Sequence, residues 1–304
     1  MISSDLSITK LSSIPNIKML LLKAALKRSS YDLEKPSEAS LPSHRFYFDG
    51  FELHEPTYRT YHQVVGWGLE SDIVHPCYLH SLAFPLHIKL LLLSEFPFPL
   101  MGLVHVSNQI NQVRPINKGE TLAATCCFGS LELHPKGWLF SIKVEFYCGS
   151  ELVWQSISTN LFRTKHGYDV GSTTKSSMVT FTEPINKTWQ LRANLGRRYA
   201  KVSGDFNPIH LTKWTAKLFG FKQHIIHGMW TKSYCVSALQ KINPKLFSQA
   251  FEFNTTFKQP LYLPSQVNMA VQPSADDEQH FQVLGIGKNN EQSPLHLIGN
   301  IRAI

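Results

Sequence analysis

Features that several classes of protein require are missing from this 304-residue sequence. It has only five cysteines, an odd number without a Cys-x-x-Cys pair, which favours free thiols in a reducing cytoplasm and indicates no zinc site. The apolar stretch from Leu82 to Val104 is interrupted by prolines and charged residues, so it does not predict a membrane span. The apolar segment 18–28 is too short and too far from Met1 for a signal peptide. We expect a cytoplasmic protein in which 18–28 is an amphipathic helix packed on the rest of the chain.

Acidic residues are almost absent from the segment 184–232, where Asp205 is the only one. Nine basic residues are spread through the same segment: Lys187, Arg192, Arg197, Arg198, Lys201, Lys213, Lys217, Lys222 and Lys232. The net charge of +8 suits nucleic acid, an anionic membrane or a phosphate-bearing ligand. Because the chain has no zinc-finger signature, no RNA-recognition signature and no basic tail, nucleic acid is not the expected partner. The basic segment is therefore either a solvated face or a surface that binds an anionic group.

The order of predicted elements repeats once along the chain. A helical stretch follows Pro76 and reaches about Ser94, and the strand-like runs after it lie at 103–113, 120–133, 138–148 and 152–163. A second helical stretch follows Gly228 and reaches about Ile242, and the strand-like runs after it lie at 250–258, 265–272, 280–287 and 295–302. One helix followed by several antiparallel strands, written twice, predicts an α+β fold of two similar units whose sheets join side by side. We place an N-terminal helical extension at 1–43 and the two units at 44–165 and 179–304, with a polar boundary between them.

The two halves differ at the segment SGDFNPIH, residues 203–210, which has no counterpart before the first helix. Pro208 disfavours helical backbone at Asn207, so Asn207 suits an N-cap, with Pro208 opening a helical turn that contains His210. The Asn207 side chain could then accept a hydrogen bond from the His210 N–H. The reversal of the chain can bring Asp205 and His210 toward one point, where they could share a water molecule and move its protons. The alternative is a capped turn whose Asp205 and His210 are merely exposed.

A glycine, Gly228, opens the second predicted helix shortly after this motif. Glycine lets a ligand approach the backbone closely, and a free N–H at a helix N-terminus can hold a developing oxyanion. The alternative is that Gly228 permits tight packing of Met229 and Trp230. A water activator and an oxyanion donor together suit the addition of water beside a carbonyl group.

SGDFNPIH followed by IIHGM closely resembles the signature of the MaoC-like dehydratases, which include the (R)-specific enoyl-CoA hydratases. The resemblance is close over about 199–230 and looser over the C-terminal strands. It implies two tandem hot dog domains, each a long helix wrapped by an antiparallel sheet. The unit at 44–165 would be a degenerate copy, and the unit at 179–304 would carry the hydratase motif.

The resemblance implies a cofactor-free, metal-free hydro-lyase that adds water to trans-2-enoyl thioesters to give (R)-3-hydroxyacyl thioesters, or runs the reverse dehydration. Asp205 and His210 would activate the water, and the Gly228 N–H would hold the thioester oxygen. The residues expected to contact the substrate or shape its site are Ser203, Asn207 and His227. The acyl carrier would be coenzyme A or an acyl carrier protein, whose phosphates or acidic surface the basic segment could bind.

One position departs from the family pattern. Hydratases of the family often have a serine eight residues after the glycine, near the aspartate, whereas this chain has Val236 there, with Ser233 and Ser237 nearby.

The apolar residues from Leu82 to Leu93 could line an acyl tunnel or could be plain core. The alternatives to a hydratase are a non-catalytic module that binds acyl-CoA or acyl carrier protein and, less favoured, a thioesterase. Because two units already form a pseudo-dimer, either a monomer or a homodimer is expected.

Overall fold

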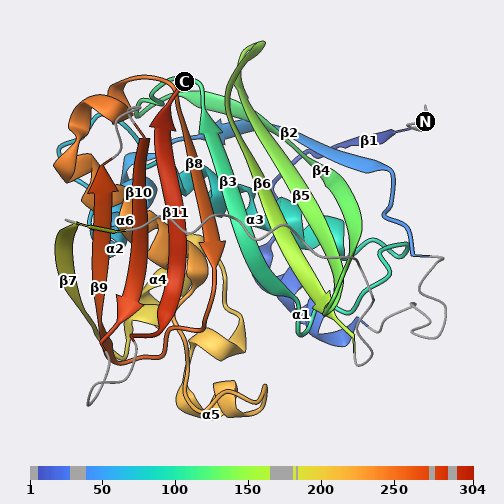
Figure 1. Cartoon of the computed structure of the whole chain (residues 1–304). Helices are drawn as coiled ribbons and strands as arrows, with labels where there is room; N and C mark the ends of the chain where they lie inside the picture. The colour runs from blue at the N-terminus through green and yellow to red at the C-terminus, as the bar shows by residue number, and fades with distance from the viewer. Residues whose placement is uncertain (1–5, 28–38, 165–180, 183, 274–277, 287–292) are drawn as a thin grey trace.

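The computed structural model describes residues 6–27, 39–164, 181–182, 184–273, 278–286 and 293–304. One eleven-stranded sheet dominates the described chain, and the main helices lie on one side of it, behind the strands in Figure 1. The helices are α1 (Ile17–Leu26), α2 (Glu55–Val65), α3 (Tyr78–Leu91), α4 (Leu195–Ser203), α5 (Lys213–Lys217) and α6 (Gly228–Ile242). Two 3-10 turns cover Pro208–His210 and Pro244–Ser248. None of the described helices is long and apolar enough to cross a membrane.

The strands fall into two groups along the chain. The first group is β1 (Ser7–Lys10), β2 (His44–Glu52), β3 (Val104–Gln112), β4 (Thr121–His134), β5 (Gly137–Cys148) and β6 (Glu151–Arg163). The second group is β7 (Ile185–Leu191), β8 (Phe251–Phe257), β9 (Ser265–Pro273), β10 (Glu278–Gly285) and β11 (Leu295–Ala303). Each predicted strand-like run therefore corresponds to an observed strand, and the predicted central helices correspond to α3 and α6.

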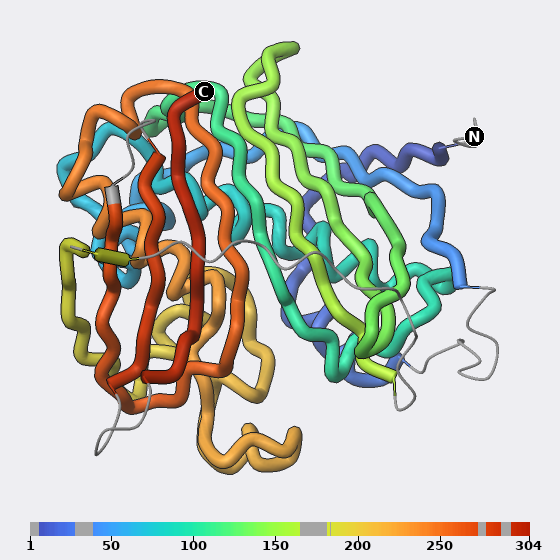
Figure 2. The backbone as a smooth tube through the Cα atoms, viewed as in Figure 1, coloured from blue at the N-terminus to red at the C-terminus, as the bar shows by residue number. Residues whose placement is uncertain are grey.

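The two halves of the sheet have the same internal order. From the outside inward, the first half runs β2-β4-β5-β6-β3 and the second runs β7-β9-β10-β11-β8. The halves join where β3 pairs antiparallel with β8, with Ile110 opposite Phe253. Figure 2 shows the blue-to-green half beside the yellow-to-red half. The predicted α+β fold of two similar units with joined sheets is confirmed, while the domain limits placed at 44–165 and 179–304 remain predictions.

The N-terminal segment is more than a helical extension. The predicted amphipathic helix is present as α1, which buries Leu20 and Ala24. However, the segment before it also contains β1, which pairs in parallel with β2 at the edge of the sheet. Because the backbone of β1 is hydrogen-bonded to that of β2, this short strand adds one strand to the edge of the sheet.

A buried lysine lies where the two halves meet. Lys232 on α6 is fully buried, and its Nζ donates to the carbonyl oxygen of Asn108 at 2.8 Å, to Asn108 Oδ1 at 2.5 Å and to the carbonyl oxygen of Phe253 at 3.3 Å. Asn108 belongs to β3 and Phe253 to β8, so one side chain bonds to both central strands. Burial lowers the pKa of Lys232 to about 7. The inclusion of Lys232 in a basic surface was therefore wrong, because its charge is enclosed by backbone and amide oxygens.

Candidate active site

The motif begins where helix α4 ends. Gly204 terminates this helix with φ of 76°, a left-handed conformation that favours glycine, and turns the chain into the motif. Pro208–His210 then form a 3-10 turn whose N-cap is Asn207, as the sequence predicted. The Asn207 side chain accepts from the Ile209 N–H at 3.3 Å and not from the His210 N–H. The His210 N–H is already bonded to the Asn207 carbonyl at 3.0 Å, because a 3-10 turn pairs residues three apart.

The environment of His210 fixes the protonation of its ring. His210 is buried, and its Nδ1 lies 2.9 Å from the carbonyl oxygen of Ile225. A carbonyl oxygen only accepts, so Nδ1 carries the proton and Nε2 keeps its lone pair. Burial lowers the pKa of His210 to about 3, so the ring is neutral at pH 7. His210 therefore presents an unprotonated Nε2, the form that a general base needs.

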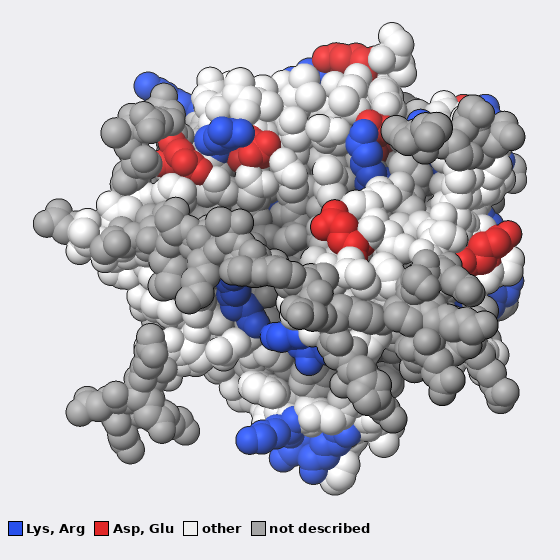
Figure 3. Space-filling view, turned by 45° about the vertical axis from the view of Figure 1, so that its right-hand side comes forward, with Lys and Arg blue, Asp and Glu red and all other residues white. Residues whose placement is uncertain are grey.

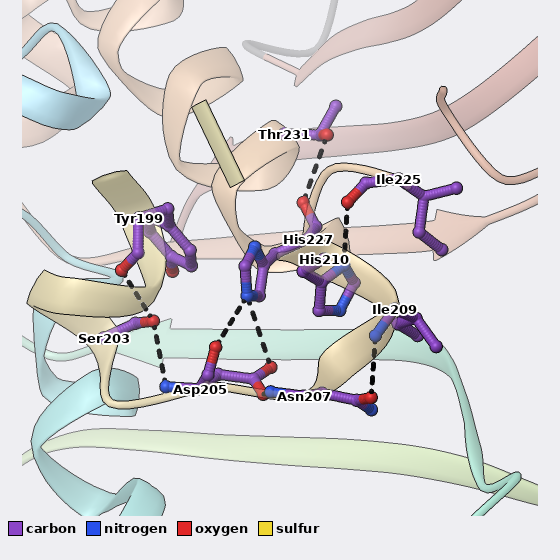
Figure 4. A network of polar contacts seen from close by, with 9 residues as sticks. All are labelled: Tyr199, Ser203, Asp205, Asn207, Ile209, His210, Ile225, His227 and Thr231. Carbon is purple, nitrogen blue, oxygen red and sulfur yellow. Dashed lines mark hydrogen bonds and ion pairs between the residues drawn. The ribbon is translucent and has the colours of Figure 1, made fainter. Parts of the chain in front are cut away.

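His227 connects the two candidate catalytic residues. Its ring stacks on that of His210, with centroids 3.7 Å apart, and its Nε2 donates to the backbone carbonyl of Asp205 at 2.9 Å (Figure 4). The same nitrogen is 3.9 Å from the Asp205 carboxylate. Burial lowers the pKa of His227 to about 4, so this contact is not an ion pair at neutral pH. His227 is almost fully buried and its Nε2 is already bonded to the Asp205 carbonyl, which favours a positioning role; its predicted contact with substrate remains a prediction.

Asp205 is held by its own loop. Its Oδ1 accepts from the Asn207 N–H at 3.1 Å, and its backbone N–H donates to Ser203 Oγ at 3.3 Å. Ser203 in turn donates to the Tyr199 carbonyl on α4, as Figure 4 shows. The carboxylate is left about one-third exposed, so it can reach a bound molecule.

The position that departs from the family pattern does not contribute to this support. Val236 is fully buried in the core. Ser233 and Ser237, its neighbours on α6, both donate to carbonyl oxygens of their own helix, those of Met229 and Ser233. The contacts that hold Asp205 therefore come from residues 203–207 and from His227, which explains how the loop keeps its shape without a serine at 236.

The structure brings the predicted pair to one point. One polar side-chain atom from each of Asp205, His210 and His227 lies within 4.8 Å of the other two. A water molecule that makes two ordinary hydrogen bonds can bridge atoms up to about 5.6 Å apart, so Asp205 and His210 can share one. Three such groups could also hold a metal ion. However, Nε2 of His227 donates to the Asp205 carbonyl, so this nitrogen could bind a metal only by giving up that proton and that hydrogen bond.

A cavity of about 320 Å³ adjoins the motif. The predicted site residues Ser203, Asp205 and Asn207 are part of its lining, together with Tyr199, Pro208 and Met229 of the same half of the chain. The first half of the chain contributes residues that include Leu21, Phe84, Ile88, Leu91, Leu103 and Ile142. The expectation that residues 82–93 line a tunnel is met in part, because Phe84, Ile88 and Leu91 line the cavity while Leu86 and Leu90 are fully buried core.

Gly228 is the first residue of α6, as predicted. The first N–H groups of a helix have no acceptor within it, so the Gly228 N–H is free to bind an oxygen. Met229, the next residue, lines the cavity. A Cβ at Gly228 would lie 2.9 Å from the ring of Phe257, so tight packing also requires glycine here, against Phe257. The neighbour that requires glycine is thus Phe257 and not Met229 or Trp230 as expected, and the role of the Gly228 N–H as an oxyanion donor remains a prediction.

A second glycine that sequence reasoning missed controls the position of His210. Gly196 on α4 lies so close to the 3-10 turn of the motif that a Cβ would be 2.2 Å from the carbonyl oxygen of His210. We expect Gly196→Ala to displace the turn and lower kcat by about 10–100-fold, because a shift near 1 Å is enough for such a loss. The control is Gly68→Ala, because a Cβ at Gly68 would meet open space. Steady-state kinetics and thermal unfolding of the two variants measure the effect. Full kcat in folded Gly196→Ala would contradict it.

Sequence reasoning also missed three histidines of the cavity wall, His80, His87 and His105. His80 and His87 are seven residues apart on α3, a spacing that places them on one helix face. That spacing was the available signal, but the surrounding apolar residues made the stretch look like core. Their position becomes apparent only when β3 and α3 pack around the same cavity.

Comparisons with known proteins give a consistent result. Residues 182–293 match the family described as MaoC like domain. 3-hydroxyacyl-thioester dehydratase X of Mycobacterium tuberculosis (strain ATCC 25618 / H37Rv) is 27% identical over 238 residues, 78% of this chain and 82% of that protein. The crystal structure of HtdX of Mycobacterium tuberculosis matches with a TM-score of 0.72 at 25% identity, covering 86% of this chain and 100% of the other. A conserved hypothetical protein of Mycobacterium tuberculosis with a double hotdog fold matches with a TM-score of 0.55 at 11% identity, over 85% and 96% of the two chains.

Proposed function

We propose that this chain, whose residues 182–293 match the MaoC like domain and which has a double hot dog fold, is a hydro-lyase acting on acyl thioesters. The reaction is the (R)-specific hydration of a trans-2-enoyl thioester, or the reverse dehydration of a 3-hydroxyacyl thioester. The observation that supports it best is the proximity of the neutral His210 ring to the Asp205 carboxylate, which lines the cavity. The similar dehydratase of Mycobacterium tuberculosis adds support, because its name states the same reaction class.

In the proposed mechanism a water molecule lies between Asp205 and His210. Nε2 of His210 takes a proton from this water while Asp205 accepts its other hydrogen bond, and the hydroxide adds to C3 of the enoyl thioester. The Gly228 N–H binds the thioester oxygen as negative charge develops there. The proton then passes to C2, so that one molecule of water has been added across the C2–C3 double bond. His227 and Asn207 hold the two groups in place through the contacts described above.

A hydration assay tests the proposal. Purified protein is mixed with trans-2-enoyl-CoA and trans-2-enoyl acyl carrier protein of short, medium and long chains, and loss of the conjugated double bond is followed. We expect turnover, with a 3-hydroxyacyl product of R configuration by chiral chromatography. Tight binding without turnover would favour a non-catalytic binding module, and release of free thiol from saturated acyl-CoA would favour a thioesterase.

The surface near the motif suits an anionic carrier. Lys213 and Lys217 lie on α5, which projects from the body as a short helix capped by Thr212, and Lys222 follows it. Figure 3 shows Lys and Arg gathered on the lowest part of the molecule, where Figure 1 places α5. We call Lys213, Lys217 and Lys222 the basic protrusion. All three are exposed and none has an ion pair within the described residues, so their charge is available to phosphates or carboxylates.

Reversing the charge of the basic protrusion should weaken binding without affecting chemistry. We expect Lys213→Glu combined with Lys217→Glu to raise KM for the thioester severalfold and to leave kcat nearly unchanged, because these residues lie outside the catalytic turn. The increase should shrink as salt is added. The matched control is Lys241→Glu combined with Lys245→Glu, two exposed residues at and beyond the opposite end of α6. An equal KM for the two variants would show that the basic protrusion does not bind the carrier. Measuring KM with thioesters of coenzyme A and of acyl carrier protein shows which carrier it binds.

A further inference from the structure

The cavity has a polar wall that the proposed chemistry does not use. His80 and His87 of α3 and His105 of β3 line it, together with Asn160 of β6, which lies directly opposite His105 in the sheet. The rings of His80 and His87 meet edge to face at 5.0 Å, and the rings of His80 and His105 are parallel at 6.1 Å. We call these four residues the polar wall. All of them belong to the half of the chain that has no catalytic motif.

Three ring nitrogens of this wall are buried and unpaired. They are Nδ1 of His80, Nε2 of His87 and Nε2 of His105, none of which has a hydrogen-bond partner among the described residues. His80 is 7% exposed and His87 is 5% exposed, so bulk water does not solvate them in the folded chain. An unpaired polar group in such a place lacks the hydrogen bonds that it would make with water in the unfolded chain. A ligand atom that pairs with these nitrogens restores part of that hydrogen bonding.

The charge of the wall restricts which ligand atom suits it. Burial lowers the pKa of His87 to about 4 and that of His105 to about 3, and it places the pKa of His80 well below its usual range. The rings are therefore neutral at pH 7, and each offers one donor and one acceptor. Lys232, whose charge acts on His80 and His105, has its Nζ bonded to three protein oxygens. The wall thus suits a neutral oxygen better than a carboxylate.

We propose that the polar wall selects acyl thioesters whose chain carries a hydroxyl or carbonyl oxygen beyond the reacting C2–C3 bond. The wall and the motif line the same cavity, so one acyl chain can contact both. Phe84, Ile88 and Leu91 of α3 receive the methylene groups, while His80 and His87 on the same helix receive the oxygen. This selection rests on the proposed hydro-lyase function, because it names the substrate class of that same site.

The first experiment compares matched substrates with the wild-type protein. Each pair of trans-2-enoyl-CoA substrates has one chain length, with one member unsubstituted and the other bearing a hydroxyl or oxo group at each carbon in turn beyond the reacting bond. We expect kcat/KM to be about tenfold higher for the oxygenated member at the position that meets the wall. A wild-type preference for the unsubstituted chain overturns the proposal.

Variants separate recognition by the wall from general damage. His87→Leu should remove the preference by weakening turnover of the oxygenated chain and improving that of the plain chain, whereas His87→Gln, which keeps a donor and an acceptor, should retain part of it. The matched control is Ile88→Val, a neighbouring cavity residue, which should change both members of a pair alike. An unchanged ratio in folded His87→Leu and His80→Leu overturns the proposal. If no member of any pair is hydrated, the hydro-lyase function itself fails, whereas hydration without preference overturns only the selection.

Discussion

Replacing His210 by glutamine, or Asp205 by asparagine, is expected to lower kcat for enoyl-thioester hydration by about 10²–10⁴-fold. Glutamine can still donate a hydrogen bond to the Ile225 carbonyl, so the His210 variant keeps the buried contact while losing the basic ring nitrogen. Asparagine can still accept from the Asn207 N–H, so the Asp205 variant keeps the loop while losing the carboxylate charge. Steady-state kinetics on the best wild-type substrate measure both losses.

The controls are an exposed aspartate and an exposed histidine away from the motif, Asp72→Asn and His54→Gln, which should leave kcat unchanged. The double variant of Asp205 and His210 should be little worse than either single variant, because the two groups act on one water molecule. Unchanged kcat in either folded single variant would remove that residue from the mechanism. Additive losses would show that the two residues act on different steps.

The long, alternating parts of the fold could be predicted from the sequence. Residues such as Phe251 and Phe253 alternate with polar ones and lie on the buried face of a central strand. β7 was not predicted, because only Trp189 and Leu191 of its residues are buried and its register is set by pairing with β9. α4 was not predicted either, because it is short and its basic exposed residues obscure the apolar pattern to which the buried Tyr199 belongs. Edge strands and short helices depend on contacts that no local pattern contains.

In the candidate site too, features set by neighbouring residues could be predicted from the sequence, whereas features set by distant contacts could not. Proline at 208 and the N-cap at 207 act within a few residues, so the turn of the motif could be predicted. The carbonyl that orients His210, the glycine at 196 that admits the turn, and the stacking of His227 come from elsewhere in the fold. Lys232 was misplaced for this reason, because a lysine looks exposed until the strands that enclose it are known.

Acid is expected to unfold the chain steeply below pH 6.5, because many of its histidines are buried in neutral form. Burial lowers the pKa of five of them to about 3 or 4, namely His62, His87, His105, His210 and His227. In the unfolded chain each has a pKa near 6.5, so as the pH falls the unfolded state takes up protons first. The stabilisation from these rings is fully present above pH 6.5 and is lost as the pH falls toward 4.

Each such ring lowers the free energy of unfolding by about 1 kcal/mol for each pH unit in this window. Because a folded chain has only about 5–15 kcal/mol in total, five rings acting together can exhaust it within about two pH units. The prediction also bears on catalysis. His210 stays unprotonated until far below pH 6.5, so loss of activity in acid should follow unfolding and not titration of the base.

Thermal unfolding from pH 8 to pH 4.5, with calorimetry in buffers of different ionisation enthalpy, measures both the fall in Tm and the protons taken up on unfolding. We expect an uptake of about seven protons per chain near pH 5, five from these rings and two from His75 and His80, whose pKa values burial also places well below the usual range. His62→Gln should reduce this uptake by about one, whereas the exposed His54→Gln should leave it unchanged, which separates buried rings from histidine content. A flat Tm across this range, or uptake of less than one proton, would mean that these rings are protonated in the folded chain. A protonated His210 could not serve as the base, so the same result would also count against the role proposed for it.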